Sequence, residues 1–166
     1  MAARGSIAGA RKPLRRCEQG GWAIIELVTG AIIGAPRSVV WDILADWPRY
    51  GEWNPYVREI SGTMTNGALL SVTVSPPGGM SRTFRPTVTR VEPGRAFAWA
   101  WAMWRPALFI GEHIFELEDL ADDNTRLIHR EEFSGLITPL HRLTRFEVTR
   151  RGFEAMNQAL KLRAAA

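Results

Sequence analysis

The chain has 166 residues, 46% of them hydrophobic and 23% charged, which suits one globular domain with a full hydrophobic core and excludes a largely disordered protein. The net charge of +4 arises in residues 1–21, which hold five of the 21 basic and one of the 17 acidic side chains, so the other 145 residues carry 16 of each sign. Because a phosphate-binding face needs positive charge clustered on the folded domain, we expect no nucleic-acid partner.

Residues 1–21 form a basic segment rich in Ala, Gly and Arg, in which no apolar period is sustained. We expect a disordered tail here, with a targeting peptide or a contact to an anionic surface as the alternative. The single cysteine, Cys17, lies in this segment, so an internal disulfide is impossible. No window contains the ~18 apolar residues of a membrane span, and we therefore expect a cytoplasmic protein.

The folded domain is expected over residues 22–163, and it begins with a strand predicted by the Ile- and Val-rich run from 21 to 34. Apolar residues then recur with helical spacing from Val39 to Trp47. The next segment, 47–55, contains two tryptophans, a tyrosine and two prolines. Its prolines limit any second helix to a turn or two, and so much aromatic area must be buried against a core or at the rim of a cavity.

Runs typical of strands follow, separated by turn signals such as Asn66-Gly67 and Glu92-Pro-Gly94. They span residues 56–62, 67–75, 82–91, 96–104, 108–118 and 125–133. The segment 138–163 returns to helical spacing, with one apolar face made of Leu140, Leu143, Phe146, Phe153, Met156 and Leu160. Gly152 in its middle suggests close packing or a bend.

This order predicts an α+β fold, in which a curved antiparallel sheet of about seven strands wraps around a long C-terminal helix and two short helices follow the first strand. Only the last helix is long enough to cover the inner face of such a sheet. A curved sheet cannot pack tightly along the whole of one helix. We therefore expect a hollow between them, of the kind that binds apolar ligands.

Several motifs of the chain resemble the SRPBCC, or START-like, superfamily of helix-grip proteins, within it most closely the polyketide cyclase/dehydrase-like branch. The matching segments are 41–46, 47–62, 91–94, 111–117, 125–135 and 152–157, and the resemblance extends over residues 22–163, nearly the whole folded domain. The resemblance implies the helix-grip fold. Because the superfamily includes carriers, aromatic cyclases and chaperone co-activators, it implies no fixed catalytic set, and the site must be argued from the residues.

Strand alternation places three polar side chains on the inner face of the last hairpin. A turn near 121–124 favours a register in which Leu117 faces Thr125 and His113 lies opposite His129, whereas a shift by two residues places His113 opposite Glu131. In both registers the two histidines and Glu131 share one face. That face also carries Phe115, Leu117, Leu127 and Phe133, and the opposite, solvent face carries Glu112, Glu116, Glu118, Arg126 and Arg130.

Three interpretations of His113, His129 and Glu131 stay open. They are core residues bonded to one another, polar groups that orient a ligand, or a general acid/base set in which a histidine moves a proton and Glu131 orients it. We expect no metal, because the three lack close-spaced ligand motifs, and no cofactor. The expected ligand contacts are Trp53, Phe97, Trp99, Trp101, Met103, Phe115, Phe133, Phe146 and Phe153.

The sequence thus predicts binding of a small hydrophobic ligand, aromatic, polyketide-like or lipid-like, by a monomer or homodimer. One alternative is a cyclase or dehydratase that uses the histidines and Glu131 for proton transfer. A second is a protein–protein interaction module, for which the cavity would be filled by Trp99, Trp101 and the helix.

Overall fold

The computed structural model of the protein describes residues 24–102, 109–135 and 138–166, with the backbone alone for 138–145. The predicted tail with Cys17 and the predicted contact Met103 lie outside these residues. The elements are β1 (Ile25–Ile33), α1 (Arg37–Ala45), a short 3₁₀ turn η1 (Trp47–Arg49), α2 (Tyr50–Trp53), β2 (Val57–Ser61), β3 (Ser71–Val74), β4 (Arg82–Phe84), β5 (Thr87–Glu92), β6 (Ala96–Ala102), β7 (Ile110–Asp119), β8 (Thr125–Ser134) and α3 (Thr138–Ala164).

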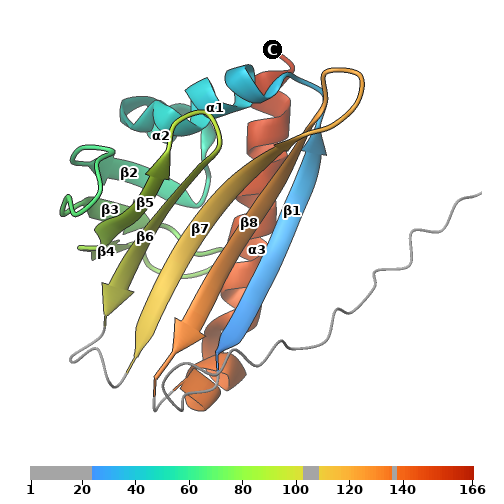
Figure 1. Cartoon of the computed structure of the whole chain (residues 1–166). Helices are drawn as coiled ribbons and strands as arrows, with labels where there is room; N and C mark the ends of the chain where they lie inside the picture. The colour runs from blue at the N-terminus through green and yellow to red at the C-terminus, as the bar shows by residue number, and fades with distance from the viewer. Residues whose placement is uncertain (1–23, 103–108, 136–137) are drawn as a thin grey trace, which may run out of the picture.

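The strands form one five-stranded antiparallel sheet in the order β1-β8-β7-β6-β5 and a smaller one in the order β2-β3-β4. The helix α3 lies across one face of the larger sheet, and α1 and α2 lie at one end of it (Figure 1). This confirms the predicted α+β fold with a sheet around a long C-terminal helix. Within the described residues no helix is long and apolar enough to cross a membrane.

The strand predicted over 82–91 is divided into β4 and β5, so the described chain has eight strands where the sequence suggested about seven. Pro86 lies between them and cannot donate a ladder hydrogen bond. The two sheets stay joined next to it, where the N–H of Leu70 donates to the carbonyl of Pro86 at 2.8 Å and Leu69 pairs with Thr87.

The register preferred for the last hairpin is wrong, and the shift by two residues is the one observed. Leu117 pairs with Leu127, and His113 pairs with Glu131. The reason is a shorter loop than expected, because the strands pair up to Asp119 and Thr125. Within this loop the N–H of Leu120 donates to the carbonyl of Asn124 at 2.8 Å, and Asp122 and Asp123 adopt positive φ values of 59° and 53°. A shift of two residues preserves which side chains share a face.

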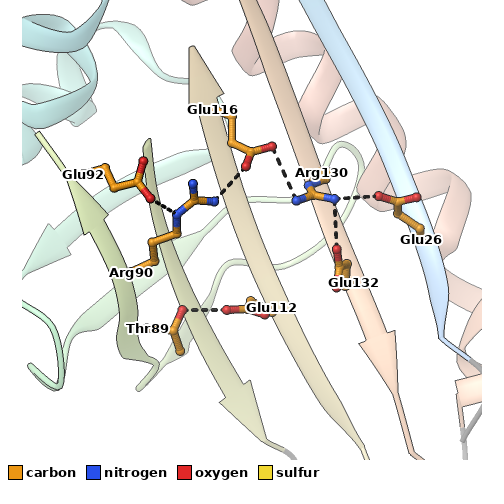
Figure 2. A network of polar contacts seen from close by, with 8 residues as sticks. All are labelled: Glu26, Thr89, Arg90, Glu92, Glu112, Glu116, Arg130 and Glu132. Atoms are coloured by element: carbon orange, nitrogen blue, oxygen red, sulfur yellow. Dashed lines mark hydrogen bonds and ion pairs between the residues drawn. The ribbon is translucent and has the colours of Figure 1, made fainter. Parts of the chain in front are cut away.

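The face assignment is confirmed on the outer side of the sheet, where an ion-pair network crosses from β5 to β1 (Figure 2). Arg90 contacts Glu116 at 2.8 Å, and Arg130 contacts Glu116 at 3.4 Å and Glu26 at 3.1 Å. Arg90 reaches β7 across β6 because its neighbour on β6 is Ala98, which is too short to obstruct it. The alanines of β6 thus belong to the outer face, as the alternation predicted.

The apolar face of α3 is buried against the sheet through Phe153, Met156 and Leu160. Gly152 lies beside them, and a Cβ there would overlap the ring of Tyr56, the residue just before β2. The ring of Tyr56 packs edge-on against Phe153 at 5.6 Å. Gly152 therefore marks close packing, one of the two roles expected for it.

We expect Gly152→Ala to lower the free energy of unfolding by about 1–3 kcal/mol, because the added methyl group must displace a buried aromatic ring. Helix propensity alone would raise it by about 1 kcal/mol, so the sign of the change identifies the cause. Urea denaturation measures it, with the exposed Gln158→Ala on the same helix as control. A variant more stable than the wild type would contradict the packing argument.

Candidate functional site

A cavity of about 120 Å³ lies between the two sheets and α3. That volume approaches the roughly 150 Å³ of an apolar protein cavity that holds benzene, and is below the ~300 Å³ of sites for drug-sized ligands. The wall consists of Tyr56, Val72, Val74, Pro76, Arg82, Phe84, Pro86, Trp99, Trp101, His113, Glu131, Phe133 and Thr149. Most of this surface is apolar, and a few polar groups converge on it.

The aromatic part of the wall comes from both sheets. Trp99 and Trp101 point inward from β6, and Phe133 points inward from β8, as alternation predicts. From the small sheet, Phe84 of β4 approaches Trp101, with ring centroids 5.1 Å apart. A ring-sized ligand would therefore find aromatic surface on both sides.

Glu131 is the buried acid of the cavity wall. The indole Nε1–H of Trp101 donates to its Oε1 at 3.1 Å. To reach β8 from β6 the indole must cross β7, and it does so over Gly111, where a Cβ would lie 2.7 Å from the indole nitrogen. Burial raises the pKa of Glu131 to about 7, although the Trp101 hydrogen bond acts in the opposite direction.

Tyr56 belongs to the cavity wall and carries a hydroxyl group, and Thr149 of α3 belongs to the same wall. Burial, and secondarily the charge of Glu131, raises the pKa of Tyr56, so the phenol is neutral at physiological pH. The turn that delivers Tyr56 is held by Asn54, whose Oδ1 accepts from the N–H groups of Tyr56 and Val57 at 3.0 and 2.9 Å. The motif at 53–55 is therefore a turn that orients the tyrosine.

The two histidines form a buried pair, in which His113 belongs to the cavity wall and His129 lies behind it. His113 and His129 are 5% and 0% exposed, and their Nε2 atoms lie 2.6 Å apart. The ring planes differ by 3° and the centroids are 4.8 Å apart, so the rings lie almost in one plane and meet at their Nε2 edges. Phe115 of β7 and Phe153 of α3 each stack on both imidazoles.

A second hydrogen bond holds the pair to the helix. Nδ1 of His129 bonds to Oδ1 of Asn157 at 2.7 Å, and Nδ2 of Asn157 donates to the hydroxyl of Thr29 at 3.0 Å. Burial lowers the pKa of His113 well below its usual range and lowers that of His129 to about 3, so both rings are neutral at pH 7. The residue that orients a histidine is therefore Asn157; Glu131, expected in that role, bonds to Trp101 instead.

The sequence-predicted residues divide into those that line the cavity and those that support it. Trp99, Trp101, Phe133, His113 and Glu131 belong to the wall. The others do not line the cavity: His129 lies behind His113, and Phe115 and Phe153 stack on the histidine pair. Three aromatic residues lie further out, with these distances between ring centroids: Phe97 to Phe115 4.6 Å, Trp53 to Tyr50 5.0 Å and Phe146 to Phe133 6.2 Å.

The small sheet and Asn157 contribute to the site, although the sequence pattern did not predict this. Arg82 and Phe84 of β4 and Val72 of β3 line the cavity, but their strands are too short for alternation to assign an inner face. Asn157 lies on the predicted apolar face of α3, four residues after Phe153, and that position was the available signal. In the described part of the chain, no group of three metal-ligating side chains is assembled.

A sheet that grips a long C-terminal helix, with a cavity between them, defines the helix-grip class of proteins. Residues 25–165 match the model of the family described as polyketide cyclase / dehydrase and lipid transport, and the chain belongs to that family. The resemblance seen in the sequence is thereby confirmed. Proteins of this class typically bind small hydrophobic ligands.

Solved structures share the fold at low sequence identity. The Zhui aromatase/cyclase from Streptomyces sp. R1128 is 17% identical with a TM-score of 0.69, covering 86% of this chain and 94% of that one. A START superfamily protein from Mycobacterium smegmatis is 18% identical (TM-score 0.65; 84% and 97%). Norcoclaurine synthase from Thalictrum flavum, in complex with dopamine and hydroxybenzaldehyde, is 9% identical (0.66; 93% and 96%). No curated protein matches the sequence.

Glu131 should make the stability of the protein depend on pH. In the folded protein Glu131 keeps its proton up to a pKa of about 7, whereas in the unfolded chain it releases the proton near pH 4.5. The contribution of Glu131 to stability is therefore complete below pH 4.5 and is lost as the pH rises to 7. We expect Glu131→Gln to be more stable than the wild type at pH 8, by on the order of 3 kcal/mol.

Urea denaturation of both proteins at pH 5 and pH 8 measures this effect. The two histidines act in the opposite direction, since their lowered pKa values cost stability as the pH falls below 6.5, but they are present in both proteins and cancel. The exposed Glu59→Gln serves as control. An equal stability difference at the two pH values would show that Glu131 is not a buried acid.

Proposed function

We propose that the protein binds a small, flat and mostly apolar molecule in the cavity between the two sheets and α3. The observation that carries this proposal is the composition of the wall, in which Trp99, Trp101, Phe84 and Phe133 surround a space of about 120 Å³. An aromatic ring gains free energy both from apolar burial and from ring contacts, and the few polar groups fix its orientation.

Polar groups gather on one part of this wall. Glu131 is held by Trp101 and His113 is held by His129, and Tyr56 belongs to the same wall. Glu131 and His113 are therefore oriented before any ligand arrives, which reduces the entropy lost on binding. An aromatic molecule with one or two oxygen substituents suits this wall better than a plain alkyl chain. The two aromatic molecules bound to norcoclaurine synthase are of that kind.

Binding can be tested by native mass spectrometry of the purified full-length chain and by quenching of tryptophan fluorescence with a panel of phenols and fatty acids. We expect Val74→Phe, which fills the cavity from β3, to weaken aromatic binding at least tenfold. The matched control is Val28→Phe on β1, where the side chain is 47% exposed on the outer face.

Equal affinities in these two variants and the wild type would place binding elsewhere. If the wild type carries no co-purified molecule and none of the panel quenches its fluorescence, the proposal fails. The protein–protein alternative then becomes the better explanation of the family match.

A second candidate function, proton transfer on a polyketide-type ketone, is favoured by one observation. Glu131, with a pKa of about 7, is suited to accept a proton at neutral pH, and it faces the cavity. Its carboxylate would remove a proton from the carbon next to a carbonyl group, and the enolate oxygen would be stabilised by a neighbouring hydroxyl such as that of Tyr56.

Deuterium exchange into 2,4-pentanedione, followed by NMR at pH 7.5, tests this chemistry. We expect a catalysed exchange that Glu131→Gln reduces by about 10²-fold or more and Glu59→Gln leaves unchanged. His113→Ala and His129→Ala test whether the histidines also take part in proton transfer. In an enzyme that uses the histidines they abolish exchange, and in a binding protein they weaken ligand affinity only by about 1–3 kcal/mol.

A further inference from the structure

We propose that the cavity selects ligands that carry a hydrogen-bond donor, such as a phenolic hydroxyl, and that Asn157 is the positioning residue that sets this preference through His129 and His113. The inference rests on the proposed function, because it names the chemistry of the molecule that the same cavity binds. It comes from the direction in which four successive hydrogen bonds must run.

The first of these hydrogen bonds involves Thr29 of β1, which is not among the residues that line the cavity. The hydroxyl of Thr29 donates its single proton to the carbonyl oxygen of His129 at 3.0 Å. In its contact with Asn157 the hydroxyl oxygen of Thr29 must therefore be the acceptor. The amide nitrogen of Asn157 therefore faces Thr29, and the amide oxygen faces His129. Because an amide oxygen only accepts, Nδ1 of His129 carries the proton.

The position of the proton on His129 determines the position of the proton on His113. His129 is neutral, so with its proton on Nδ1 its Nε2 is an acceptor. A hydrogen bond of 2.6 Å between the two Nε2 atoms then requires the proton to belong to His113. A proton on Nδ1 of His113 would instead leave two lone pairs facing each other between the Nε2 atoms. The reversed bond, with Nε2 of His129 as the donor, is excluded because the proton of His129 is held on Nδ1 by the amide oxygen of Asn157.

His113 is consequently left with an unprotonated Nδ1. Of the two rings, only His113 belongs to the cavity wall. Within the described residues no hydrogen bond uses its Nδ1. Phe115 and Phe153 stack on both rings, which prevents the imidazoles from rotating to exchange roles. The cavity therefore presents a fixed acceptor, and a ligand that donates to it is preferred over an isosteric one that cannot.

Phenol and toluene test this preference, because they have the same shape and differ in one donor. The full-length wild type, Asn157→Leu and Asn157→Asp are titrated with each at pH 8.5 by tryptophan fluorescence. We expect Asn157→Leu to lose about tenfold in phenol affinity relative to toluene. Leucine has no acceptor for Nδ1–H of His129, so the proton of His129 is no longer fixed on Nδ1. Asn157→Asp should keep the wild-type ratio, because a carboxylate also accepts from Nδ1.

Nitrogen-15 NMR of the histidine side chains supplies a readout that a merely structural role would not change. In the wild type we expect the proton on Nδ1 of His129 and on Nε2 of His113, and in Asn157→Leu a mixture of tautomers. A proton on Nδ1 of wild-type His113, or the same phenol-to-toluene ratio in wild type and Asn157→Leu, would overturn the inference alone. If the wild type binds neither molecule, the proposed function and this inference both fail.

Discussion

The hydrogen bond between the two buried imidazoles constrains the sheet, the helix and the cavity at once. It joins β7 to β8 on the inner face, and Asn157 extends it to α3. Burial keeps both rings neutral, and because the amide oxygen of Asn157 holds the proton of His129 on Nδ1, the 2.6 Å contact between the rings has one possible proton arrangement. The bond from Asn157 to His129 therefore fixes the position of α3 relative to β8. The cavity lies next to this pair, on the side of His113.

Small residues make that arrangement possible, because they let large side chains cross backbone elements. Gly152 admits the ring of Tyr56 against α3, and Gly111 admits the indole of Trp101 across β7. On the outer face Ala98 lets Arg90 extend over β6 to Glu116. In each case the functional or stabilising group comes from one element and contacts another, and the glycine or alanine at the point of contact contributes only its small size.

The wall of the cavity combines two kinds of polar group. Glu131 changes charge near neutral pH, whereas His113 stays neutral and has a fixed direction. The first kind suits proton transfer and the second suits recognition, so binding and catalysis would use different residues of one wall. The family description names both cyclases and lipid transport, so proteins of similar shape but different chemistry are expected in this family.

The sequence by itself determined the order of the elements, the inner and outer faces of the long strands, and the presence of His113, Glu131, Trp99 and Trp101 on the inner face. These features follow from local periodicity, which a register shift of two residues does not change. Only the tertiary structure decided that Asn157 orients His129, that β4 separates from β5 at Pro86, and that Phe84 completes the aromatic wall. Those contacts join residues far apart in the chain or on very short strands, and no local pattern encodes the distance between them.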